Sequence, residues 1–201
     1  MPFRWFALAS LVGCFGVSVY YRRRARVAGG AIPRSRERPL LILGRVAVAL
    51  PLFLGVLTYA ANPRWMAWSA LALPAWVRWT GVVLGLAMVP AAYWVFRTLG
   101  RNVSETVLTR EHHELVTTGP YRVIRHPLYA MGIGLFLAVG LMAASWFILL
   151  FALIVVASIR LVVVPLEERE LEAKFGDAYR RYRERTGALV PRLTSGRRPP
   201  R

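Results

Sequence analysis

Long apolar stretches alternate along the chain with short stretches rich in arginine. Three apolar stretches, at 3–21, 40–61 and 75–96, each approach the roughly 20 residues that an α-helix needs to cross a bilayer. The first is expected to be a retained helix and not a cleaved signal peptide, because no small-residue cleavage site separates Tyr21 from Arg22. The pattern therefore predicts three membrane-spanning helices in the first half of the chain.

The last apolar block, 132–165, is too long for one straight crossing. As a single helix it would extend ~50 Å at ~1.5 Å per residue, well beyond a hydrocarbon core of ~30 Å. A hairpin that begins near Pro127 and turns near Gly140–Ser145 divides the block into two arms. The prediction is an all-α integral membrane protein with five transmembrane helices, the last two forming a helical hairpin.

Composition supports the membrane assignment. The chain has 201 residues, of which 56% are hydrophobic and 18% charged, and its formal net charge is +17. In a soluble protein this charge would suggest nucleic acid, but here the arginines flank apolar spans, where they contact anionic lipid headgroups. We therefore expect membrane lipids and no nucleic acid as partners. The single cysteine, Cys14, lies in an apolar run, so there is no disulfide framework.

Charge also predicts the orientation. The loop 22–38 holds seven arginines and one glutamate, whereas the loop 62–74 holds one arginine. An excess of arginine in a short loop marks the cytoplasmic side of a membrane. Alternation then places the N-terminus outside, and the loop 97–126 and the tail 166–201 in the cytoplasm.

Two polar clusters, 112–129 and 165–193, each adjoin one arm of the hairpin, so the hairpin is expected to bring them together. In the first, a Gly119–Pro120 turn precedes His126 and Pro127, and proline suits the first turn of a helix. The free N–H groups of such a helix start attract an anionic group.

In the second cluster, Pro165 marks the end or a kink of the last span, and Glu167 and Glu168 follow at the membrane surface. Read alone, this acidic stretch also fits a solvated helix face. Tyr179 and Tyr182 share a face, with packing as their default interpretation.

Three histidines, His112, His113 and His126, raise the question of a metal. No cysteine or carboxylate at suitable spacing completes a recognisable site, so no metal is predicted.

Taken together, five pieces of sequence resemble the isoprenylcysteine carboxyl methyltransferase family, to which phospholipid methyltransferases are related. They are "LGRNVSETV", "HHELVTTGPYRVIRHPLY", the Glu167–Glu168 doublet, "FGDAYRRY" and "TGALVPRL". The resemblance implies an integral membrane enzyme that uses S-adenosylmethionine without a Rossmann fold. It assigns 97–193 to a methyltransferase region with a cytoplasmic loop, the hairpin 127–165 and a C-terminal cytoplasmic helix. Residues 1–96 form the N-terminal transmembrane helices, and 194–201 read as a disordered tail.

The resemblance also implies a cofactor site on the cytoplasmic side. Glu167 is expected to accept hydrogen bonds from the ribose or the amine, and His126 with the helix start to hold the carboxylate. Tyr121 or Tyr129 is expected to stack on the adenine or face the cation. The implied cofactor contacts are His113, Glu114, Leu115, Val116, Tyr121, His126, Pro127, Leu128, Tyr129 and Glu167.

The chain departs from the family pattern at two positions. Met131 stands where members often have glycine, and Val163 stands where the prenylcysteine enzymes have an arginine that contacts substrate. Arg160 lies about one helical turn before Val163 on nearly the same face, and either replaces that arginine or snorkels to the membrane surface.

We expect methyl transfer to a lipophilic acceptor that enters from the bilayer. A carboxylate of the prenylcysteine type would need no base but a positioning cation, for which Arg125, Arg160 and Arg192 are candidates. An ammonium acceptor of a phospholipid or other small lipid would need a base, Glu168 or His126.

Two other classes stay open at this point. One is an NADPH-dependent membrane reductase of the sterol type. The other is a non-enzymatic scaffold or transporter, since Arg45 and Arg160 lie within spans, although no inverted repeat supports transport.

Overall fold

The computed structural model describes residues 2–29, 39–100 and 115–192, and its regular elements are helices. The predicted all-helical class is confirmed. The longer helices are α1 (Phe3–Gly29), α2 (Pro39–Ala61), α3 (Ala75–Leu99), α4 (Pro127–Ala143), α5 (Trp146–Ser158), α6 (Val164–Phe175) and α7 (Asp177–Arg185). The short ones are the 3-10 helices η2 (Pro63–Ser69) and η4 (Gly119–Arg122) and the π-helical turn η5 (Ile159–Val163).

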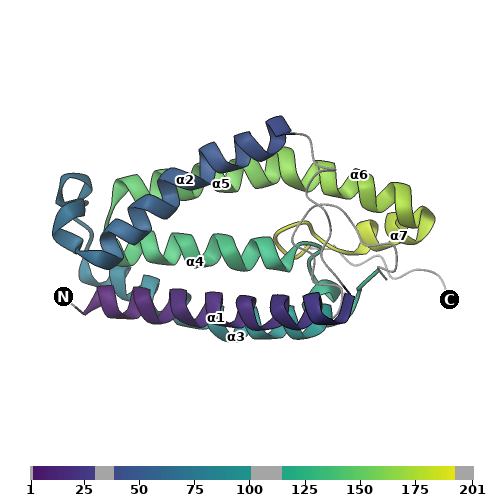
Figure 1. Ribbon diagram of the computed structural model, residues 1–201, viewed down its shortest axis with the longest axis horizontal. Helices are drawn as coiled ribbons and strands as arrows, with labels where there is room; N and C mark the ends of the chain where they lie inside the picture. Colours follow the sequence, from purple (N-terminus) through teal and green to yellow (C-terminus); the bar gives the residue numbers. More distant parts are fainter. Residues whose placement is uncertain (1, 30–38, 101–114, 193–201) are drawn as a thin grey trace.

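The helices α1 to α5 run roughly along one axis, with α4 between α1 and α3 on one side and α2 and α5 on the other (Figure 1). Glycines allow the closest approaches. A Cβ at Gly81 of α3 would lie 2.9 Å from the carbonyl oxygen of Ala138 in α4. One at Gly85 would lie 2.8 Å from Ser10 Oγ in α1. Small residues at such crossings are typical of helices that pack within a membrane.

The predicted hairpin is present, and its turn lies inside the predicted window. Helix α4 ends at Ala143, Ala144 takes a left-handed conformation with φ of 50°, and α5 begins at Trp146. Ser145 caps α5, because its Oγ accepts a hydrogen bond from the backbone N–H of Ile148 at 3.3 Å. The same Oγ lies 2.7 Å from Ser69 Oγ, so the turn is fixed to η2 at this end of the bundle.

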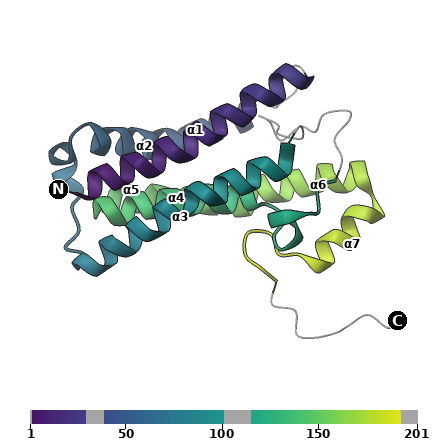
Figure 2. The same cartoon turned by 90° about the horizontal axis from the view of Figure 1, so that it is seen from below.

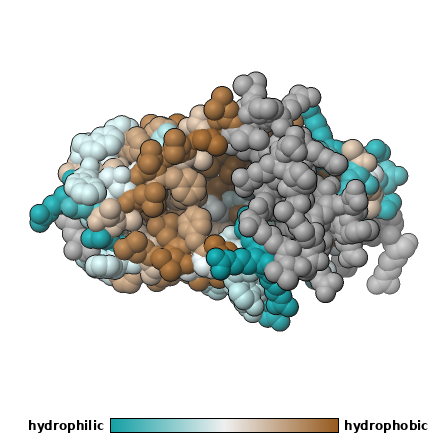
Figure 3. Space-filling view, viewed as in Figure 1, coloured by the Kyte–Doolittle hydropathy of each residue, from teal (hydrophilic) through white to brown (hydrophobic). Residues whose placement is uncertain are grey.

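Apolar helices occupy all five predicted positions. In the part of the chain that the structure describes, three helical stretches are long and apolar enough to cross a membrane: Phe3–Ala25, Ala75–Leu99 and Trp146–Phe175. Val46–Ala61 and Pro127–Ala143 are shorter apolar helices. On the face shown in Figure 3, hydrophobic residues cover most of the part to the left of the grey residues, and hydrophilic residues lie at both ends and along the lower edge. The exact number of crossings stays a prediction.

The helix that holds the second hairpin arm does not end at Pro165. It continues through the π-helical turn η5 into α6. Proline cannot donate a hydrogen bond within a helix and crowds the preceding turn, and a wider turn relieves that conflict. The prediction that Arg160 and Val163 share nearly the same face is wrong: within this turn Val163 is buried and Arg160 is exposed.

The polar C-terminal segment forms two helices where one was expected. Gly176 separates α6 from α7 and has φ of 53°, a conformation that residues with a Cβ rarely adopt. The chain reverses there, so α7 returns toward η4 and the start of α4 (Figure 2).

Candidate active site

The two polar clusters meet at the end of the bundle opposite the N-terminus (Figure 2). Ile124 and Gly187 form an isolated parallel bridge. The backbone N–H of Arg125 donates to Gly187 O at 2.8 Å, and that of His126 donates to Ala188 O at 3.0 Å. The predicted juxtaposition of the clusters is therefore present, and it is held by backbone hydrogen bonds.

His126 stands at the N-cap position of α4 and its side chain is only 4% exposed. Its Nε2 lies 3.3 Å from Glu168 Oε1, and its Nδ1 lies 3.6 Å from Glu167 Oε2. The Tyr129 ring, one turn into α4, stacks on the imidazole at a centroid distance of 5.7 Å. A buried imidazole is thus held between two adjacent carboxylates and an aromatic ring.

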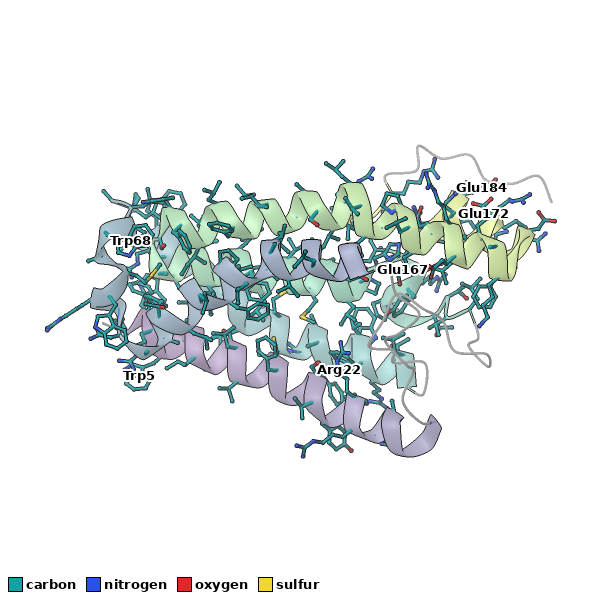
Figure 4. The ribbon with its side chains drawn as sticks, turned by 45° about the horizontal axis from the view of Figure 1, so that its top comes forward. Trp5, Arg22, Trp68, Glu167, Glu172 and Glu184 are labelled. Atoms are coloured by element: carbon teal, nitrogen blue, oxygen red, sulfur yellow. The ribbon has the colours of Figure 1, made fainter. Side chains whose placement is uncertain are left out.

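Glu167 and Glu168 lie near the start of α6, just past the apolar part of that helix. In Figure 4, Glu167 lies between the apolar helices and the polar end that carries Glu172 and Glu184. Glu168 Oε1 also accepts from Arg125 Nε at 2.9 Å and pairs with Arg125 Nη2 at 2.8 Å. Burial opposes ionisation of Glu168, but the hydrogen bonds from His126 and Arg125 outweigh it and lower the pKa of this carboxyl.

Arg125 connects the acidic pair to α7. While its Nε and Nη2 hold Glu168, its Nη1 donates to Arg183 O at 3.0 Å and to Thr186 O. Carbonyl groups at a helix C-terminus lack partners within the helix and attract a cation. All three guanidinium nitrogens are therefore engaged with the protein itself.

Three tyrosines surround the acidic pair from the side of η4 and α7. The hydroxyl of Tyr182 donates to Tyr121 O at 2.7 Å, and burial raises the pKa of Tyr182 to about 12. Burial, and then the charge of Glu167, raise the pKa of Tyr121. Tyr179 is fully buried, and its hydroxyl has no hydrogen-bond partner among the described residues. The spacing of Tyr179 and Tyr182 in the sequence predicts packing for both rings. It cannot show that the hydroxyl of Tyr179 has no partner among the described residues.

The other predicted cofactor contacts have different positions. Pro127 takes the first position of α4, where its missing N–H costs no hydrogen bond, and its side chain is buried. Leu128 packs toward the cluster that contains Cys14 and Phe96. Leu115 and Val116 are half-buried in irregular chain before η4. His112, His113 and Glu114 lie outside the described residues.

The remaining predicted arginines do not join the cluster of charges. Arg160 is exposed in the π-helical turn, as described above. Arg192 is exposed, and its Nη1 donates to Glu184 O at 2.6 Å. Within the described ranges, no group of three or more histidine, cysteine or acidic side chains could hold a metal ion.

Comparison with known proteins identifies relatives of this chain. Methanethiol S-methyltransferase 2 of Bradyrhizobium diazoefficiens is 46% identical over 78 residues, which make up 39% of this chain and 29% of that protein. Methanethiol S-methyltransferase 1 of the same organism is 42% identical over 71 residues, 35% of this chain and 24% of that protein. The cobalt-zinc-cadmium resistance protein CzcN of Cupriavidus metallidurans is 34% identical over 85 residues, 42% of this chain and 39% of that protein. The chain thus matches well under half of each relative's length.

The fold also has a solved counterpart. The eukaryotic intramembrane Ras methyltransferase, isoprenylcysteine carboxyl methyltransferase, matches with a TM-score of 0.54 over 92% of this chain and 67% of that one. The sequence identity is 17%, so this likeness shows a shared fold. A family model described as phospholipid methyltransferase matches residues 76–178, slightly more than half of the chain. The predicted resemblance is therefore confirmed, and the chain belongs to the phospholipid methyltransferase family of membrane methyltransferases.

Proposed function

We propose that this protein transfers a methyl group from S-adenosylmethionine to a small apolar thiol that reaches the site from the bilayer. The single observation that carries the proposal is the buried His126 imidazole between the carboxylates of Glu167 and Glu168, at the start of α4. It supports both parts of the reaction, since the same cluster can hold a charged cofactor and accept a proton.

The residues present fit the cofactor. Two adjacent carboxylates complement its positive charge and can accept hydrogen bonds from an ammonium or ribose hydroxyls. The half-buried ring of Tyr129, stacked on His126, suits an adenine or a sulfonium. First-turn N–H groups of α4 suit its carboxylate. When bound, S-adenosylmethionine supplies an electrophilic methyl group.

The geometry favours a thiol over a carboxylate as the acceptor. A carboxylate needs a cation to position it, but Arg125 is engaged with Glu168 and with the carbonyls at the end of α7. Arg160 and Arg192 are exposed, and Val163 replaces the arginine that the prenylcysteine pattern requires. The two methanethiol S-methyltransferases among the relatives act, by their names, on a small thiol.

A thiol must lose its proton to become a good nucleophile, because its reference pKa is ~8.5. With the ring proton on Nε2, His126 donates a hydrogen bond to Glu168, which Arg125 holds in place. Nδ1, 3.6 Å from Glu167 Oε2, is then the atom that takes the thiol proton. Arg125 acts through Glu168 and is a positioning residue.

Binding is the first test. S-adenosylhomocysteine should bind the detergent-solubilised protein in calorimetry, and Glu167→Gln and His126→Ala should each weaken binding by about tenfold or more, since each removes a charge-assisted contact. NADPH should give no thermal shift. Folded wild-type protein that binds no S-adenosylhomocysteine would contradict the proposal.

The acceptor is tested with methyl-labelled cofactor. Membranes supplied in parallel with a short-chain thiol, a prenylcysteine analogue and phosphatidylethanolamine vesicles should place label in a volatile or extractable thioether. Label in a base-labile ester would favour the prenylcysteine carboxylate instead, and label in the phospholipid would favour N-methylation.

A further inference from the structure

We propose that Tyr179 is a further cofactor-binding residue, whose buried hydroxyl donates a hydrogen bond to the bound adenosyl cofactor. This inference rests on the proposed function, because it names a new contact in the same site.

The hydroxyl of Tyr179 stands out because no residue in the described part of the chain pairs with it. The residue is 0% exposed, and among the described residues no group hydrogen-bonds to its Oη. More than nine in ten buried polar groups in proteins are hydrogen-bonded, because leaving one unpaired after desolvation is costly. A buried hydroxyl that is unpaired without ligand is therefore suited to a partner that arrives with the ligand.

The surroundings of this hydroxyl belong to the candidate site. Burial raises the pKa of Tyr179, and the charges that act on it are those of Glu168, Arg125 and Glu167. The two carboxylates lie beside the His126 ring, and Arg125 pairs with Glu168. Because Tyr179 keeps its proton throughout the neutral range, it presents an O–H donor next to the acidic pair. Its partner must therefore carry an acceptor, which the ribose, adenine and carboxylate of the cofactor all do.

The neighbouring tyrosine provides a matched control on the same helix. The rings of Tyr179 and Tyr182 lie 6.1 Å apart, and both are buried. The hydroxyl of Tyr182, however, is already paired with Tyr121 O at 2.7 Å. The two Tyr→Phe substitutions thus remove the same hydroxyl oxygen from the same helix. For Tyr182 this hydroxyl has a protein partner, and for Tyr179 it has none among the described residues.

The experiment compares Tyr179→Phe and Tyr182→Phe in the full-length protein. Calorimetry with S-adenosylhomocysteine gives the affinity, and a thermal melt without ligand gives the stability. Tyr179→Phe should melt at or above the wild-type temperature but bind about tenfold more weakly, which corresponds to about 1.4 kcal/mol. Tyr182→Phe should melt at a lower temperature, because it leaves the Tyr121 carbonyl without its donor.

Two results would overturn the inference. If Tyr179→Phe bound S-adenosylhomocysteine as tightly as wild type, its hydroxyl would not contact the ligand. If it instead lowered the melting temperature as Tyr182→Phe does, the hydroxyl would be paired within the protein. Both differ from failure of the proposed function, in which the wild-type protein itself would bind no S-adenosylhomocysteine.

Discussion

At the scale of single residues, the site is organised by Arg125 rather than by the histidine next to it. Its guanidinium contacts Glu168 with two nitrogens and the end of α7 with the third. A lysine could not reproduce this, because its ammonium is a point charge without the planar fork. The sequence predicts Arg125 as a cation for the substrate, because a pattern of charges cannot show which partner a charge will find after folding.

The same contacts predict how stability depends on pH. Because the folded protein lowers the pKa of Glu168, the ionised carboxylate stabilises the fold above its unfolded pKa of about 4.3. That stabilisation is lost as the pH falls through the lower, folded value. Glu168→Gln should therefore melt below wild type at neutral pH, and the gap should narrow in acid when melting temperature is measured against pH. Glu184→Gln, at an exposed position of α7, is the control and should show a small gap throughout.

A gap between wild type and Glu168→Gln that stayed constant down to strongly acidic pH would show that the Arg125–Glu168 contact does not depend on the carboxylate charge. The measurement needs no ligand, so it reports on the site separately from cofactor binding.

At the scale of elements, the hairpin was predictable and the turn before α6 was not. The hairpin follows from length alone, because one straight helix through the last apolar block would overshoot a bilayer. The π-helical turn at Ile159–Val163 depends on how a continuous helix accommodates Pro165, whereas proline in a sequence predicts only an end or a kink. The break at Gly176 was also missed, because a glycine inside a polar helical pattern is weak evidence.

We expect the site to depend on Gly187, which follows α7 and forms the bridge with Ile124. A Cβ there would overlap Val190 O and lie 3.0 Å from Arg192 N, so Gly187→Ala should displace the segment that pairs with Ile124. We expect Gly187→Ala to lose most S-adenosylhomocysteine affinity while the helix content measured by circular dichroism stays close to wild type.

The matched control for that variant is Ser145→Ala at the opposite end of the bundle. It removes the cap of α5 and the contact with Ser69, so it should cost about 1 kcal/mol of stability and leave the affinity unchanged. Unaltered affinity in Gly187→Ala would mean that the bridge is not needed for the site.

At the scale of the whole molecule, the candidate site lies at the end of the bundle opposite the N-terminus. Trp5 and Trp68 lie at one end of the bundle, and Glu167 lies toward the other (Figure 4). The three stretches long enough to cross a membrane run between these ends. Charge in the loops predicted which end faces the cytoplasm, and the arrangement of the helices is compatible with either orientation.

Cysteine labelling tests the orientation. In a Cys14→Ala background, a membrane-impermeant maleimide should label Ala67→Cys in η2 on intact cells. Arg181→Cys in α7 should be labelled only after permeabilisation. Both positions are exposed, so access depends on the side of the membrane and not on burial. The opposite labelling pattern would reverse the predicted orientation.

The bridge between Ile124 and Gly187 has a consequence for biosynthesis. The backbone N–H groups of Arg125 and His126 gain their acceptors only from Gly187 and Ala188, which are translated about 60 residues later. Helices α1 to α3 precede both partners in the chain, whereas α4, α5, α6 and the acidic pair are translated during that interval. A chain that ends after α7 would lack the acceptors of these two N–H groups, and we expect it to enter the membrane without binding S-adenosylhomocysteine.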